Sequence, residues 1–361
     1  MTPFPRADYD GLSLYEPGRG PVAIDLSDNT NLWGTHPTAL ERIRAATTDD
    51  LARYPELYAD VLRDAVAERF GVDPECVTTG AGSDDVLDSA FRAAYAPGAR
   101  VAYAAPTFSM VEPFAAMNGM SATAVPWPDA LGDAALLLAE SPAVVYVCRP
   151  NNPTGELAPR EWVDQLLDAR DTGGARGERP GLPLVIIDEA YGDFAGETLI
   201  PLAASHPNVL VTRTASKAYG LAGLRCGFAV GDRPTALAVE KSRGPYKVAR
   251  PASECAAAAI RDAGGWLATC VAECVENRER LRAELEARGL VPPPSRANFL
   301  LCPAPSGSAA RDAAALRELG IGVRAFTGIP NIEEGLRVTI GPWPLMESFL
   351  EALDRTREAR T

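Results

Sequence analysis

The sequence predicts an α/β protein in which a large domain, built on a mostly parallel and doubly wound sheet, is joined to a smaller α+β domain. Two observations support this prediction. Between about residues 70 and 230, short apolar runs typical of buried parallel strands alternate with segments of helical periodicity. After about residue 240 this alternation stops, and a long helical stretch precedes a few strands and helices. Strands separated by helices favour right-handed crossovers with helices on both faces of the sheet.

The elements of the larger domain are expected in a regular order. A short strand at 76–79 leads through a glycine turn into a helix from Asp84 to Tyr95, whose apolar residues at 86, 87, 90, 91 and 94 have helical spacing. Further strands are expected at 100–103, 143–148, 184–188, 209–212 and 226–230. The segment from Asp171 to Pro183 is rich in Gly, Arg and Pro and is expected to be an exposed loop.

The domain boundaries follow from this change of pattern. We expect an N-terminal arm at 1–34, the large domain at 35–240 and the small domain at 241–361. The small domain begins with a helical stretch from Ala252 to Arg288, interrupted near Gly264-Gly265 and ended by Pro292-Pro293-Pro294. Strands at 299–301 and 337–340 and helices at about 309–319 and 345–358 complete it.

Composition excludes several classes of function. The chain has 361 residues and a formal net charge of −13, with scattered Lys and Arg, which disfavours nucleic acid and anionic membranes as partners. It has no apolar run of membrane-spanning length and no apolar signal core near its start, so we expect a cytoplasmic protein. The seven irregularly spaced cysteines predict buried thiols, and with only two histidines, His36 and His206, no metal site is expected.

Four short motifs carry the chemistry. They are Asn151-Asn152-Pro153-Thr154-Gly155, Asp188-Glu189-Ala190-Tyr191, Thr214-Ala215-Ser216-Lys217 and the glycine-rich segment around Arg225. Together they supply an amine, an acid, hydrogen-bond donors and phosphate-binding groups, which is the set that pyridoxal 5′-phosphate (PLP) requires. Any one motif is common in proteins, whereas the four in this order predict a PLP site.

Each residue of this set has an expected role and a plain alternative. Lys217 would bind the cofactor aldehyde covalently and then move a proton, although most lysines are surface residues. Asp188 ends a strand and could pair with the protonated pyridine nitrogen, or could simply cap the next helix. Tyr191 and Asn152 could donate to the ring oxygen, although Asn-Pro often only starts a turn.

The phosphate would bind at the turn Gly80-Ala81-Gly82-Ser83-Asp84, where a strand meets a helix N-terminus. Ala81, Gly82 and Ser83 are the candidate residues of this turn, and the alternative is an ordinary turn with Ser83 or Asp84 as the N-cap. Thr214, Ser216 and Arg225 would add contacts from the lysine segment, the last as a paired charge.

Two further residues are candidates for the ring and the substrate. Phe108 could stack on the pyridine ring or could be a core aromatic residue. Arg337 interrupts an apolar strand with a planar cation suited to bidentate carboxylate binding, and an exposed strand position is its alternative.

These residues resemble those of the fold-type I PLP-dependent aminotransferases of class I/II, whose fold is similar to that of aspartate aminotransferase. The resemblance spans nearly the whole chain and is strongest to the histidinol-phosphate aminotransferases. The residues that carry it are Leu14-Tyr15-Glu16-Pro17-Gly18, Arg53-Tyr54-Pro55, the glycine turn with Ser83-Asp84, Pro106-Thr107-Phe108-Ser109-Met110, Thr214-Ala215-Ser216-Lys217, Leu224-Arg225-Cys226-Gly227, Ala297-Asn298-Phe299 and Leu336-Arg337-Val338-Thr339.

The resemblance implies a reaction and an assembly. It implies transfer of an amino group between an amino acid, or an amino-alcohol phosphate such as histidinol phosphate, and a keto acid. It places Tyr54 at the cofactor phosphate of a neighbouring subunit, and so implies a homodimer with shared active sites. The N-terminal arm would pack against the partner subunit. Tyr15, Asn29 and Asn298 would lie near the substrate, and Arg337 would bind its carboxylate or equivalent anionic end.

The chain departs from this pattern at three places. The short family segment Asn-Glu-Asn-Pro-aromatic-Gly is altered and longer here, as Ser27 to Gly34; Val111 replaces a usual aromatic residue; and Lys247 replaces a usual Asn. A specialised aromatic or cationic amino or keto acid of secondary metabolism therefore stays open beside histidinol phosphate.

Three other functions also stay open at this stage. A PLP-dependent decarboxylase would use the same residues, because the bond that breaks is the one held perpendicular to the ring. A PLP-binding regulator is disfavoured because the chain has no room for a preceding DNA-binding domain. A nucleotide-binding protein is disfavoured because neither glycine-rich nucleotide motif occurs.

Overall fold

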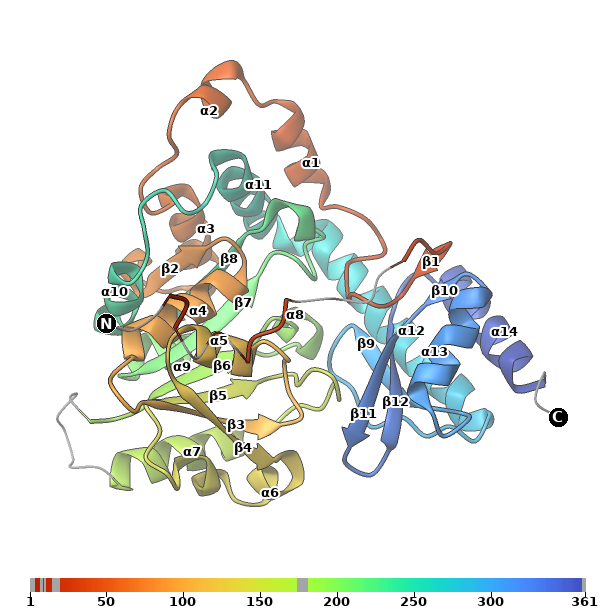
Figure 1. Ribbon diagram of the computed structural model, residues 1–361. Coiled ribbons are helices and arrows are strands. Elements are labelled where there is room, and N and C mark those ends of the chain that lie inside the picture. Colours follow the sequence, from red (N-terminus) through yellow and green to blue (C-terminus); the bar gives the residue numbers. More distant parts are fainter. Residues whose placement is uncertain (1–3, 7–8, 10, 15–19, 174–180, 359–361) are drawn as a thin grey trace.

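The computed structural model describes residues 4–6, 9, 11–14, 20–173 and 181–358. Its larger part is a seven-stranded sheet with the strand order β2-β8-β7-β6-β5-β3-β4 (Figure 1). The strands are β2 (Val77–Gly80), β3 (Arg100–Ala105), β4 (Ser121–Pro126), β5 (Val144–Cys148), β6 (Leu184–Asp188), β7 (Val209–Thr214) and β8 (Gly227–Gly231). All pairings are parallel except the two made by β8, which confirms the predicted mostly parallel sheet.

The central strands carry continuous apolar runs because both faces of the sheet are covered. Along β5, Val145 and Val147 belong to one hydrophobic cluster, whereas Val144, Tyr146 and Cys148 belong to the other. The same alternation holds along β6 and β7, so each strand contributes to two cores. The sequence did not indicate β4, because this edge strand is largely exposed and lacks a continuous apolar run.

Helices surround this sheet and connect its strands. They are α1 (Pro37–Arg44), α2 (Thr48–Ala52), α3 (Asp60–Phe70), η2 (Pro74–Cys76), α4 (Ser83–Ala94), α5 (Val111–Met117), α6 (Trp127–Gly132), η3 (Ala134–Leu138), α7 (Arg160–Gly173), α8 (Gly192–Ala195), α9 (Ile200–Ser205), η4 (Ala222–Leu224) and α10 (Arg233–Lys241). The prediction of a loop from Asp171 is wrong for its first residues, because α7 continues to Gly173. Residues 174–180 lie outside the described part of the chain.

The smaller part has its own antiparallel sheet. Its strands β9 (Phe299–Pro303), β11 (Arg324–Ile329) and β12 (Glu333–Thr339) have the order β11-β12-β9, with helices α12 (Ala268–Ala287), α13 (Ala309–Glu318) and α14 (Trp343–Glu358) beside them (Figure 1). The short strands β1 (Ile24–Asp25) and β10 (Ile321–Gly322) pair in parallel, which attaches the N-terminal segment to this part.

The expected helical break near Gly264-Gly265 is present as η5 (Ala263–Leu267), where Gly265 leaves the helical conformation with φ −96° and ψ −106°. The preceding helix α11 (Arg250–Arg261) packs against α1 and α3 rather than against the small sheet. We therefore propose a domain boundary at η5, beyond the expected residue 241. Among the described residues, no helix has the combination of length and apolarity that crossing a membrane requires.

The segment 27–36 lies across the loop that follows β7. Asn31 Nδ2 donates to the carbonyl of Ala218 at 2.8 Å, and the amide of His36 donates to the carbonyl of Tyr219 at 3.2 Å. Gly220 has a φ of 66°, and a Cβ on it would lie 2.0 Å from the carbonyl oxygen of Gly34. The two segments therefore meet backbone to backbone.

This contact predicts that Gly220→Ala destabilises the protein more than a matched substitution. Gly98→Ala is the control, since Gly98 also has a positive φ (80°), but no atom of the described residues lies within 4 Å of the point where its Cβ would stand. We expect Gly220→Ala to lower the free energy of unfolding by about 3 kcal/mol, against about 1 kcal/mol for the control. Urea unfolding followed by circular dichroism measures both, and equal losses would contradict the close approach.

Candidate active site

A cavity of about 630 Å³ lies where strands β5, β6 and β7 end, facing β11 and β12 of the small sheet. The carboxyl ends of parallel strands form one edge of the sheet, so the residues that end these strands meet there. The cavity is lined by Asp28, Asn29, Ser83, Asp84, Thr107, Phe108, Ser109, Met110, Phe114, Cys148, Asn152, Asp188, Ala190, Tyr191, Thr214, Ser216, Lys217, Arg225, Arg324, Ala325, Phe326 and Arg337.

Lys217 extends into this cavity from the loop after β7. Its Nζ donates to the carbonyl of Asp28 at 3.0 Å and lies 5.9 Å from the ring centre of Tyr191. Burial, reinforced by the charge of Arg337, lowers the pKa of this amine to about 8. A substantial fraction of the amine is therefore unprotonated near neutral pH, as a nucleophile requires. The alternative of a surface lysine is wrong.

Asp188 lies at the floor of the cavity and is only 3% exposed. Its carboxylate accepts hydrogen bonds from the Tyr146 hydroxyl at 2.7 Å, the Thr212 hydroxyl at 3.1 Å and the Ala190 amide at 3.0 Å. Burial raises the pKa of this carboxyl, and the three donors oppose that change. These donors are all neutral, so a cationic group in the cavity would stabilise the carboxylate further.

Tyr191 stands beside the amine and is held from the N-terminal segment. Its hydroxyl accepts from Asn29 Nδ2 at 3.0 Å, and the Asn29 amide donates to Thr339 Oγ1 of β12 at 3.0 Å. Burial raises the pKa of Tyr191 to about 12, so the phenol stays protonated and can donate a hydrogen bond into the cavity. Asn298 stands behind this group, with its Nδ2 donating to the Asn29 carbonyl at 3.1 Å.

Two arginines form the wall on the side of the small sheet. Arg337 is 8% exposed and donates to Asn152 Oδ1 and, at 2.7 Å, to the Ser27 carbonyl. Arg324 lies directly opposite it in the antiparallel register of β11 and β12. Both side chains line the cavity and so present positive charge to it. The alternative of an exposed strand position for Arg337 is wrong.

The turn between β2 and α4 forms a further wall. Its N-cap is Gly82 with no side-chain cap, so the alternative of Ser83 or Asp84 as the N-cap is wrong. Arg225 joins it, with Nη1 3.3 Å from Ser216 Oγ and Nη2 3.3 Å from Asp84 Oδ2. The start of β8 supports the turn closely, since a Cβ on Gly227 would lie 2.4 Å from the amide nitrogen of Ser83.

The structure brings most of the expected residues together. Asn29, Ser83, Phe108, Asn152, Asp188, Tyr191, Thr214, Ser216, Lys217, Arg225 and Arg337 all line the cavity. Ala81 and Gly82 belong to the turn but do not line the cavity. The Ala81 amide donates to Asp85 Oδ2 at 3.0 Å, and the Gly82 amide donates to the Gly80 carbonyl at 2.8 Å. Asn298 is buried behind Asn29.

Of the two remaining residues, Tyr54 belongs to the described part of the chain and lies elsewhere. Tyr54 is 78% exposed and stacks on Tyr246 with ring centres 4.8 Å apart, outside this chain's own cavity. Tyr15 lies outside the described residues. Sequence reasoning missed Arg324 and Phe326, which only the pairing of β11 with β12 places beside Arg337. It also missed Cys148, which ends β5 next to Asp188 in the parallel register.

Comparison with known proteins identifies the family. Residues 21–353 match the family "Aminotransferase class I and II", so the chain belongs to that family. The fold and the site thus define a fold-type I PLP-dependent aminotransferase, which confirms the resemblance drawn from the sequence.

Individual relatives are of two kinds. The chain is 34% identical to an aromatic amino acid aminotransferase of Streptomyces avermitilis, with 99% of this chain and 98% of that protein aligned. It is 33% identical to histidinol-phosphate aminotransferase 1 of Nostoc sp. over the full length of both. Its structure is similar to that of the histidinol-phosphate aminotransferase from Sinorhizobium meliloti in complex with pyridoxal-5′-phosphate, with a TM-score of 0.86, 26% identity and full coverage of both chains.

The lowered pKa of Lys217 predicts a pH dependence. Because dinitrofluorobenzene reacts with the unprotonated amine, its labelling of Lys217 in cofactor-depleted protein should rise with pH and be half-maximal near pH 8. The same peptide labelled in urea-unfolded protein is the control, and its midpoint should lie near the unperturbed lysine pKa of about 10.4. Mass spectrometry of the peptides measures both, and a common midpoint would contradict the prediction.

Proposed function

We propose that PLP binds in this cavity and is held covalently by Lys217, with its pyridine nitrogen at Asp188. The observation that carries the proposal is that an amine of lowered pKa and a buried carboxylate share one cavity with a phenol donor. Ser83, Thr214, Ser216 and Arg225 would hold the phosphate at the N-terminus of α4. Bound there, the cofactor would supply an electron sink for the substrate's α-carbon.

The chain's own residues would divide the remaining work. Lys217, once displaced by the substrate amine, would take the α-proton and return it, a task suited to a pKa near the working pH. The hydrogen bonds to the Asp188 carboxylate come from a tyrosine, a threonine and a backbone amide, all of which are neutral. Its negative charge would therefore keep the ring nitrogen protonated. Tyr191 and Asn152 would donate to the ring oxygen, with Asn29 fixing the phenol.

We further propose that the substrate combines an anionic end with a planar ring. Arg337 and Arg324 would hold a carboxylate or phosphate, and Phe326, Phe114 and Met110 line the adjoining cavity with apolar surface. Arg337 lies over the ring of Phe326 at 5.3 Å, so the cation and the apolar wall are contiguous. Histidinol phosphate and aromatic amino acids both satisfy these requirements, in agreement with the two kinds of relatives.

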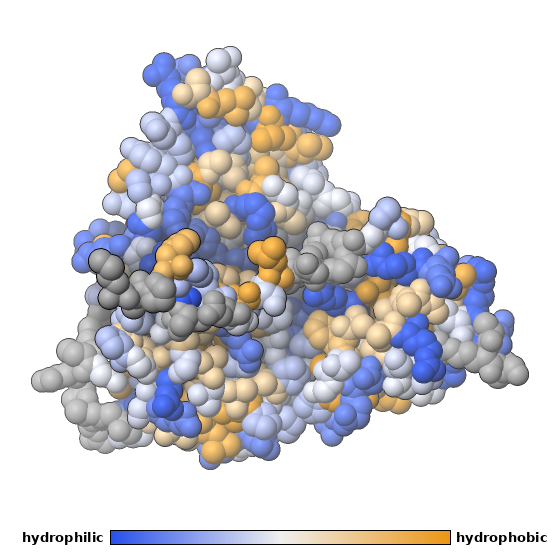
Figure 2. All heavy atoms as spheres, viewed as in Figure 1, coloured by the Kyte–Doolittle hydropathy of each residue, from blue (hydrophilic) through white to orange (hydrophobic). Residues whose placement is uncertain are grey.

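We also propose a homodimer in which Tyr54 serves the partner's cofactor phosphate. Leu51, Tyr54 and Leu57 are 71%, 78% and 41% exposed, and Figure 2 shows hydrophobic residues gathered over α1 and α2. Such a patch needs a covering surface, and a second copy supplies one. Sedimentation equilibrium decides between one chain and two. We propose a cytoplasmic location, supported by seven free and buried cysteines.

Lys217→Ala tests the reaction itself. We expect it to remove the covalent attachment of PLP that borohydride traps in the wild type and to lower the transamination rate by about 10³-fold or more. Mass spectrometry after reduction locates the bond, and amino donors are scored by formation of pyridoxamine phosphate. Release of carbon dioxide by the wild type without consumption of keto acid would favour a decarboxylase instead.

Arg337→Met tests the anion-binding wall. Losing a guanidinium that makes paired charge-assisted bonds should raise KM for an anionic donor by about 100-fold. Steady-state kinetics with histidinol phosphate and with phenylalanine would show which donor depends on it more. Arg311→Met on the exposed side of α13 is the control and should leave KM unchanged. An unchanged KM in Arg337→Met would place the anionic end elsewhere.

A further inference from the structure

We propose that Lys247 is a positioning residue for the cofactor phosphate. It would act through Asp85 of α4, which contacts the backbone of the turn between β2 and α4. The inference rests on the proposed function, in which the phosphate binds at that turn. Neither Lys247 nor Asp85 lines the cavity, so neither is placed to contact the cofactor directly. The sequence left Lys247 unexplained, as a cation where the resembling family usually has Asn.

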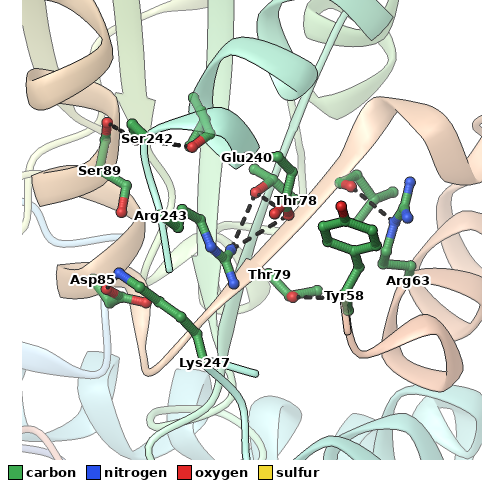
Figure 3. Close-up of polar contacts among 12 residues, drawn as sticks. Tyr58, Arg63, Thr78, Thr79, Asp85, Ser89, Glu240, Ser242, Arg243 and Lys247 are labelled. Carbon is green, nitrogen blue, oxygen red and sulfur yellow. Dashed lines mark hydrogen bonds and ion pairs between the residues drawn. The ribbon is translucent and has the colours of Figure 1, made fainter. Parts of the chain in front are cut away.

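Asp85 joins Lys247 to the backbone of the turn. Its Oδ1 accepts from Lys247 Nζ at 2.7 Å (Figure 3). Its Oδ2 accepts from the Ala81 amide at 3.0 Å. The side chains of Lys247 and Asp85 are 22% and 19% exposed, so solvent screens this ion pair only in part. A Cβ on Gly80 would lie 2.9 Å from Asp85 Oδ2, so the glycine gives the carboxylate room to reach the turn.

The backbone that carries Lys247 is itself anchored to β2. Arg243 donates to Thr78 Oγ1 at 3.2 Å and pairs with Glu240, which also accepts from Thr78 at 2.7 Å (Figure 3). The Arg243 side chain is only 3% exposed. Thr78 belongs to β2, the strand that leads into the turn. The segment after α10 therefore contacts residues on both sides of the turn, Thr78 before it and Asp85 after it.

Charge explains why a cation is needed here. Asp84 and Asp85 are consecutive carboxylates in the first turn of α4, and both would repel a phosphate dianion bound at the same helix end. Arg225 compensates Asp84 at 3.3 Å, and Lys247 compensates Asp85 at 2.7 Å. Without Lys247, only the charge of Arg243, which also acts on Asp85, would offset the Asp85 carboxylate behind the phosphate.

The test compares PLP binding with binding of pyridoxal, which lacks the phosphate, in cofactor-depleted protein. Absorbance titration of Lys247→Met should show PLP affinity about tenfold weaker, as expected for a partly buried ion pair. Asp85→Asn keeps an acceptor for the Ala81 amide but removes the charge, so it should bind PLP as well as or better than the wild type. Adding Lys247→Met to Asp85→Asn should have little further effect, and pyridoxal affinity should change in none of them.

The control is Arg261→Met, which breaks the exposed ion pair between Arg261 of α11 and Glu68 of α3 and should leave both affinities unchanged. Thermal unfolding of the cofactor-depleted variants identifies any that fail to fold, and Asp85→Asn then carries the test. Wild-type PLP affinity in Lys247→Met overturns the inference, as does an equal loss for pyridoxal. An undiminished loss in the Asp85→Asn background also overturns it, because Lys247 would then act on the phosphate without Asp85. Wild type that takes up no PLP would instead overturn the proposed function.

Discussion

The burial of one carboxylate constrains the whole site. Asp188 ends the central strand β6, where water is excluded by the residues of the neighbouring strands. A carboxylate in such a place costs several kcal/mol unless hydrogen bonds and an opposite charge offset that cost. Tyr146, Thr212 and Ala190 supply the hydrogen bonds but no charge. A ligand that brings a cation to this point would offset the remaining cost, and a protonated pyridine nitrogen, as we propose, has the required chemistry.

The N-terminal segment 27–36 connects the two sheets around this point. Asn29 joins Tyr191, which follows β6, to Thr339 of the small sheet, and Asn31 binds the loop of the lysine through the Ala218 carbonyl. The Asp28 carbonyl accepts from the Lys217 amine. This segment is also one of the three places where the sequence departs from the family pattern, and its backbone carbonyls contact both the Lys217 amine and Arg337.

Local sequence patterns predicted what depends on local physics. The central strands were predictable because burial on both faces requires continuous apolar runs, and Lys217 and Asp188 because they follow such runs. β4 was not predictable from the sequence, because an exposed edge strand contains both polar and apolar residues. α3 was not predictable either, because too few of its apolar residues lie on one face. Arg324 needed the register of β11 with β12. The Ala81 amide donates to Asp85, and the spacing of residues in the sequence does not reveal this hydrogen bond.

The anion-binding role that we propose for Arg337 and Arg324 would explain how relatives with different substrates share one architecture. Two guanidinium groups opposite each other across β11 and β12 can receive a carboxylate or a phosphate, since both anions present paired oxygens to a planar donor. The wall next to them is apolar and aromatic, with Phe326 in contact range of Arg337. Stacking on such a surface selects a planar ring without demanding one pattern of polar atoms. Discrimination between an imidazole and a benzene ring must then come from polar groups at the rim, and Thr107 and Ser109 are the lining residues that can provide them.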